Sequence, residues 1–101
     1  MDAKYFKDQI CEELAGAKCY IEKAIELKPM VPNWSKKLVE MSASELQHAE
    51  YLHEMFVEYY KRMAGAYKRI PKYVQDAYDD VLEMYDSSVA YINELHTIYN
   101  Q

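Results

Sequence analysis

The chain has 101 residues, half of them apolar, with only two glycines and three prolines. This length predicts one domain, 1–101, with a modest core, and the composition excludes a disordered or collagen-like chain. The net charge of −5 argues against nucleic acid as a partner, because phosphate binding relies on clustered Lys and Arg, and here these residues are scattered among acids.

The first predicted helix covers about residues 2–28. Its apolar residues are spaced three and four apart and form one stripe: Ile10, Leu14, Ala17, Ile21, Ala24 and Ile25. Glu13 lies within this stripe, and Tyr20 follows seven residues later on the same side. Gly16 lowers helix propensity, and we interpret it as a point where another helix comes close.

The second predicted helix covers about residues 34–66. Pro29 and Pro32 separate it from the first helix, because two prolines three apart cannot both lie inside one helix. Asn33 or Ser35 is expected to cap it. At roughly 50 Å it is unusually long for a protein of this size. We therefore expect part of it to extend beyond the core of its own chain.

Glu45 and His48, in the middle of the second helix, lie on neighbouring positions of one apolar face, together with Leu38, Leu52 and Phe56. The other glutamates of this helix fall on the opposite side: Glu40, Glu50, Glu54 and Glu58. An acid buried without a partner costs several kcal/mol. The inward position of Glu45 therefore indicates that something pairs with it.

The third predicted helix covers about residues 72–100. Its inward stripe carries no carboxylate and consists of Val74, Ala77, Val81, Tyr85, Ser88, Ile92, Leu95 and Tyr99. His96 lies at the edge of this stripe, and we interpret it as a capping or packing residue. The three segments together predict an all-α fold of three antiparallel helices.

The chain is expected to be cytoplasmic, without a membrane partner. No segment approaches the length of a membrane span, and residues 1–7 lack the apolar core of a signal peptide. Cys11 and Cys19 are roughly 12 Å apart along the first helix, too far to bridge each other. Two such thiols fit a reducing compartment and buried packing.

Glu13, Glu45 and His48 form a set that could bind a metal ion. Carboxylate oxygens with one imidazole suit iron or manganese, and zinc is an alternative. A known bundle arrangement for two metals takes a Glu from each of two helices and a Glu-x-x-His from each of two others. One chain supplies half of this set. A two-fold homodimer would complete it, which predicts two ions per dimer.

Segment 45–52, ELQHAEYL, resembles the metal-binding helix of the ferritin-like superfamily, which includes ferritins, bacterioferritins and rubrerythrins. Glu13 followed by Tyr20 is similar to the first helix of these proteins. The size resembles the half-ferritins, such as the encapsulated ferritins, whose two-helix hairpins dimerise to build a di-iron ferroxidase site. The resemblance implies that Glu45 bridges both irons, with Glu13 as terminal carboxylate and His48 as imidazole ligand. Tyr20 would hydrogen-bond to the carboxylates.

The resemblance covers about the first 65 residues and leaves the third helix outside the half-ferritin pattern. The overall sequence also resembles small prophage-encoded proteins of Gram-positive bacteria. An alternative function is a non-enzymatic helical interaction or assembly protein, in which Glu45 and His48 pair with each other or with Glu13. A metal-dependent hydrolase is a third alternative that fits less well, because the inward faces carry no further acid or base.

Overall fold

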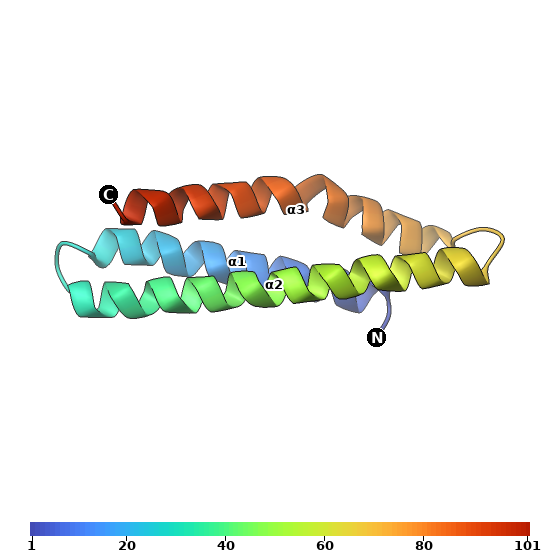
Figure 1. Ribbon diagram of the computed structural model, residues 1–101, viewed down its shortest axis with the longest axis horizontal. Helices are drawn as coiled ribbons and strands as arrows, with labels where there is room; N and C mark the ends of the chain where they lie inside the picture. Colours follow the sequence, from blue (N-terminus) through green and yellow to red (C-terminus); the bar gives the residue numbers. More distant parts are fainter.

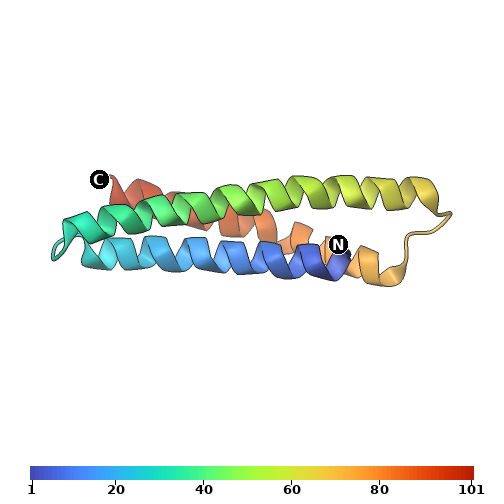
Figure 2. The same ribbon diagram turned by 90° about the horizontal axis from the view of Figure 1, so that it is seen from below.

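The computed structural model describes residues 1–101 and contains three α-helices and no strand (Figure 1). They are α1 (Ala3–Leu27), α2 (Pro32–Ala66) and α3 (Lys72–Tyr99). Successive helices run in opposite directions, and the molecule is elongated, with extents of 57 × 20 × 15 Å (Figures 1 and 2). The prediction of an all-α fold with three helices is confirmed.

The central helix of the arrangement is α1, which packs against both α2 and α3, whereas α2 and α3 make few contacts with each other. Asp2 caps α1, and its side chain accepts a hydrogen bond from the Tyr5 amide at 2.9 Å. The apolar stripe predicted for this helix is buried from Ile10 to Ala24. One buried stripe therefore serves two neighbouring helices.

Helix α2 begins earlier than the sequence predicted, at Pro32. Proline is favoured in the first turn because its fixed φ suits the helix and its missing N–H is not needed there. The prediction that Asn33 or Ser35 caps the helix was wrong, since no side chain caps α2. Ser35 is instead fully buried, and its hydroxyl donates to the Ala24 carbonyl oxygen at 2.5 Å.

An aromatic cluster fills one end of the core. The rings of Phe6 and Phe56 stack with centroids 5.2 Å apart, and Tyr78 meets Phe56 edge-on at 5.4 Å. Beyond Phe56, α2 continues past the start of α1 with α3 beside it (Figure 1), and the Tyr60 and Tyr78 rings stack at 3.9 Å. The overhang leaves α1 but not the core, because Tyr60 and Met63 still pack against it. The predicted extension beyond the core of its own chain is therefore not found along this stretch.

A polar contact joins all three helices inside the core. The Ser42 hydroxyl of α2 donates to the Ala17 carbonyl oxygen of α1 at 2.7 Å, and His96 Nε2 of α3 lies 2.9 Å from the same hydroxyl oxygen. Because the hydroxyl has only one proton, the imidazole nitrogen is the donor in the second hydrogen bond. The interpretation of His96 as a packing residue is confirmed.

The surface differs from one expectation. Cys11 and Cys19 are both exposed rather than buried. Cys11 lies about 100° around α1 from the buried Ile10, and Cys19 lies about 200° from the buried Ala17, so neither thiol is on the buried stripe.

None of the three helices combines the length and the apolar character needed to cross a membrane.

Candidate metal centre

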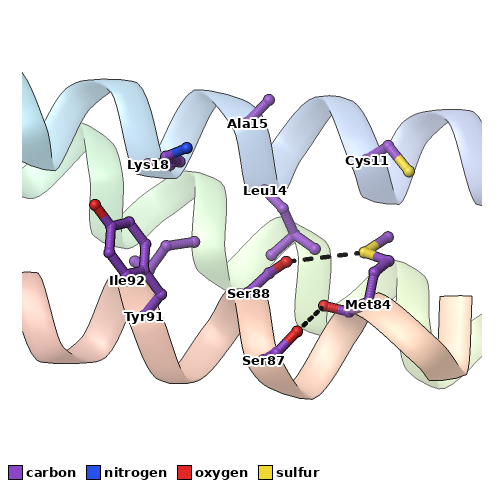
Figure 3. Close-up of a pocket in the computed structure, with 9 residues that line it drawn as sticks. All are labelled: Cys11, Leu14, Ala15, Lys18, Met84, Ser87, Ser88, Tyr91 and Ile92. Atoms are coloured by element: carbon purple, nitrogen blue, oxygen red, sulfur yellow. Dashed lines mark hydrogen bonds between the residues drawn. The ribbon is translucent and has the colours of Figure 1, made fainter.

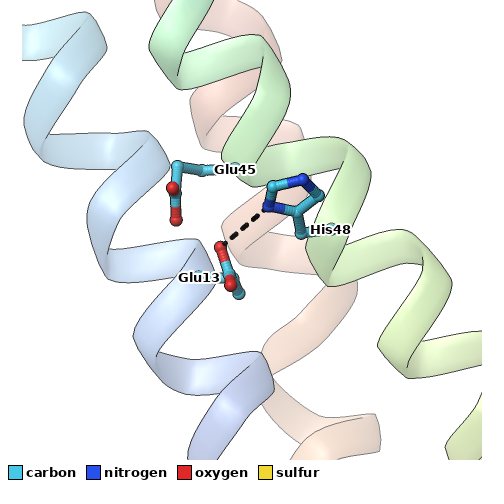
Figure 4. Close-up of side chains that lie close together, drawn as sticks. All are labelled: Glu13, Glu45 and His48. Atoms are coloured by element: carbon cyan, nitrogen blue, oxygen red, sulfur yellow. Dashed lines mark ion pairs between the residues drawn. The ribbon is translucent and has the colours of Figure 1, made fainter.

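Glu13 of α1 meets Glu45 and His48 of α2 on one side of the hairpin that these helices form (Figure 4). One ligand atom from each of the three residues lies within 4.8 Å of the other two. His48 Nδ1 is 3.6 Å from Glu13 Oε2. The structure thus brings together the three residues that the sequence singled out.

The antiparallel course of the hairpin explains why these residues meet. The Ser42–Ala17 hydrogen bond fixes the level of α2 against α1. Glu13 comes one turn before Ala17, and Glu45 comes about one turn after Ser42. Because the two helices run in opposite directions, both steps lead the same way along the hairpin, and the carboxylates reach the same level.

The cluster lies on the side of the hairpin that α3 does not cover, and α3 passes behind it in Figure 4. Ser42 and His53 mark the covered side of α2, because they contact His96 and Tyr85 of α3. Glu45 and His48 lie about 60° and about 120° around the helix from Ser42.

The open position of the cluster makes the burial of its members unequal. The side chain of Glu13 is 21% exposed and that of His48 is 56% exposed. Glu45 is half-buried. The expectation that all three residues face the interior is therefore wrong for His48, and Glu13 and Glu45 are only partly buried, on the open side of the hairpin.

Gly16 provides the space that the Glu45 carboxylate occupies. A Cβ atom on Gly16 would lie 3.1 Å from Glu45 Oε2 and 3.5 Å from its carboxyl carbon. The interpretation of Gly16 as a point of close approach is therefore refined: the group that comes close is a carboxylate side chain. The absent side chain lets this acid lie against α1 rather than turn into solvent.

Because the Glu13 and Glu45 carboxylates lie close together, a proton or a cation near them is favourable. The pKa of Glu45 is raised, first because a proton on it allows a hydrogen bond to Glu13, then because of burial and the Glu13 charge, while His48 opposes the shift. Without that proton, Glu13 Oε2 is buried and has no hydrogen-bond partner. Two carboxylates with one imidazole fit iron or manganese, and a cation would satisfy the unpartnered oxygen.

Tyr20 is half-buried on the same side of α1 as Glu13, roughly 10 Å further along the helix. The predicted hydrogen bond from Tyr20 to a metal-binding carboxylate stays a prediction.

One of the concave features of the chain is a groove between α1 and α3 (Figure 3). Leu14, Met84 and Ile92 supply much of its lining, and the Lys18 amine lies 5.6 Å from the centre of the Tyr91 ring at its edge. No carboxylate or histidine lines this groove. It therefore offers no alternative set of ligands for a metal ion.

Sequence reasoning missed two residues that position the cluster. Ser42 was not singled out. It lies seven residues from both Ser35 and Ala49, and these three small buried residues at regular spacing mark the side of α2 where α1 comes close. The contact between Gly16 and Glu45 has no signal in the sequence, because it depends on the level of one helix against the other.

Comparisons with protein-family models, with curated proteins and with solved structures find no match to this chain.

Proposed function

We propose that two copies of this chain bind iron in a ferritin-like, two-metal carboxylate centre and oxidise ferrous ion there. The observation that carries the proposal is the buried Oε2 atom of Glu13, which has no hydrogen-bond partner and lies 3.6 Å from His48 Nδ1, in a group whose three ligand atoms lie within 4.8 Å of one another. The likeness of segment 45–52 to ferritin-like metal-binding helices supports the same conclusion.

The number of ligands in one chain argues for a second copy. Two carboxylates and one imidazole are half of the set that two-metal bundle proteins use, which is a Glu from each of two helices and a Glu-x-x-His from each of two others. Two-fold pairing doubles the set to four carboxylates and two imidazoles. It would also cover the exposed side chain of His48. The dimer is therefore part of the proposed site.

The residues of the cluster have distinct tasks in this proposal. Glu45, whose carboxylate lies against Gly16 and beside Glu13, would be the acid shared by the two ions. Glu13 would hold one ion through its carboxylate, and His48 would hold it through an imidazole nitrogen. Ferrous iron would be the substrate: two ferrous ions would give one electron each to one dioxygen, which takes up two protons and leaves as hydrogen peroxide. The carboxylate oxygens would favour the ferric product because they are hard ligands.

Iron binding by the purified protein tests the proposal. Under anaerobic conditions we expect one ferrous ion per chain by elemental analysis, and on exposure to air we expect absorbance from ferric iron. Glu45→Gln and His48→Gln should abolish both while the helical circular dichroism signal is kept. Glu50→Gln is the matched control, because Glu50 is an exposed glutamate of the same helix. Manganese and zinc, added separately, show which ion the site prefers.

A helical interaction protein without metal chemistry is the second candidate function. Large apolar side chains that are more than half exposed favour it, and they include Trp34, Tyr51, Tyr67 and Tyr73. Protein that takes up no iron, manganese or zinc after reconstitution would overturn the metal proposal and leave this candidate in its place.

A further inference from the structure

Helix α2 carries a heptad pattern on the side that α3 does not cover. Intervals of four and three residues alternate along it without interruption, through Trp34, Leu38, Met41, Glu45, His48, Leu52, Met55 and Tyr59. We call these eight residues the α2 seam. Such spacing, kept over more than three heptads, is the pattern by which one helix packs along another.

The chain itself leaves the α2 seam largely uncovered. Trp34, Met41 and Met55 are exposed to 64%, 43% and 41%. Leu38, Leu52 and Tyr59 are only partly buried, at the margin of the core. When another helix covers large apolar side chains at heptad spacing, their burial lowers the free energy. The pattern thus favours contact with a helix from outside this chain.

We propose that the α2 seam packs against the same seam of a second copy, antiparallel, with the two-fold axis passing between Glu45 and His48. In antiparallel pairing the two heptad positions face each other, so that the residue numbers in each layer sum to 93. Trp34 then meets the partner's Tyr59, Leu38 meets the partner's Met55, and Met41 meets the partner's Leu52. In the central layer, Glu45 meets the partner's His48.

Two charges beside the seam complement each other in this register. Lys37 and Glu58 are exposed and lie on the flank of the α2 seam that faces away from α1. Antiparallel pairing places Lys37 of one copy level with the partner's Glu58. The Glu58 carboxylate, which pairs with Arg62 at 2.7 Å in its own helix, then gains a second cation.

The same axis passes close to Glu13 of α1. The Ser35–Ala24 and Ser42–Ala17 hydrogen bonds set the level of α2 against α1. Continued along the hairpin, this level places the point midway between Glu45 and His48 beside Glu12 and Glu13. The axis therefore brings Glu13 of each copy to the level of the central layer.

This inference deepens the proposed function, on which it rests for the pairing of two copies, and it adds the partner surface and its register. The ligands of both chains converge on the axis, and apolar layers close the site above and below. Because the seam is built mainly from apolar residues and not from the ligands, we expect it to pair without iron, and its register can be measured in a chelator.

Crosslinking of cysteine variants tests the register. Cys11 and Cys19 are first replaced by serine, and Met41→Cys and Leu52→Cys are made separately, with different tags. We expect a short bismaleimide to link the two variants when they are co-expressed, and to link neither with itself. In the proposed register, two copies of position 41 are roughly 16 Å apart, beyond the reach of the reagent.

The controls separate the seam from the metal site. Gln47→Cys, on the exposed side of α2 near α3, should not link to Leu52→Cys. Met41→Glu should convert the dimer to a monomer in sedimentation, and it leaves Glu13, Glu45 and His48 in place. Linking of Met41→Cys with itself, or a monomeric parent protein in the chelator, would overturn the seam. Correct linking without iron uptake would overturn only the proposed function.

Discussion

Glu45 Oε2 lies 3.1 Å from the position that a Cβ atom would take on Gly16. This spacing is shorter than ordinary van der Waals contact, so any side chain at position 16 must displace the carboxylate. The displaced atom is the free end of a flexible side chain, and the fold can accommodate the shift. A metal ion cannot accommodate it so readily, because ligand distances must stay within about 0.2 Å of their preferred values.

Gly16→Ala should therefore separate stability from metal affinity. In the metal-free protein we expect the free energy of unfolding to rise by up to about 1 kcal/mol, because alanine is the better helix former. Iron affinity should fall by about 10-fold. Urea unfolding and isothermal titration measure the two effects. Gly65→Ala is the matched control, since nothing lies within 4 Å of its added Cβ, and its iron affinity should be unchanged.

Glu45→Gln should stabilise the metal-free protein at neutral pH. The pKa of Glu45 is raised above its ordinary value of 4.5, chiefly through its hydrogen bond with Glu13. The stability that this proton provides is present below pH 4.5 and is lost as the pH rises through the raised pKa. The amide mimics the protonated acid. The gain in melting temperature should thus be larger at pH 8 than at pH 4, and an equal gain at both would contradict this explanation.

Ser42→Ala should cost the fold about 1–3 kcal/mol, because it leaves the Ala17 carbonyl oxygen and the His96 N–H without their shared partner inside the core. Chemical unfolding followed by circular dichroism measures the loss. Ser44→Ala, an exposed serine two residues further along α2, should change the free energy of unfolding by less than about 0.5 kcal/mol. Equal losses for the two variants would show that the contact adds no stability.

Mild acid should weaken the attachment of α3. Burial lowers the pKa of His96 and, more strongly than the nearby acids raise it, that of His53. For a histidine with a lowered pKa, stability is complete above 6.5 and is lost as the pH falls below that value. We expect melting temperatures to drop between pH 7.5 and pH 5.5. The drop should be smaller in the double variant His53→Gln/His96→Asn, and a drop of the same size would exclude these two residues.

The sequence alone was enough to predict the three helices and to single out the three residues of the candidate metal centre. Stripes at intervals of three and four predicted which sides of α1 and α3 are buried, because the helical repeat is fixed by backbone geometry. Glu13, Glu45 and His48 could be singled out because charged residues on apolar stripes are rare. Their meeting also followed from hairpin geometry, since a short turn leaves few levels at which two helices can pack.

The remaining features depend on contacts between helices, which periodicity does not contain. The start of α2 at Pro32 and the inward turn of Ser35 were missed because a serine before a helix fits both a cap and a close contact. The exposure of His48 was missed because the side on which α3 packs is not specified by α2 alone. It follows from the pairing of α3 with α1.

The greater contact of α3 with α1 than with α2 has a consequence for local unfolding. Since α3 packs mainly on α1, it can detach in one step while the α1–α2 hairpin keeps its packing. Backbone amides of α3 should then exchange with deuterium together and ahead of those of α1, at a rate insensitive to iron. Backbone amides on the open side of the hairpin would stay protected from exchange throughout, because α3 does not hold Glu13 and Glu45 in place.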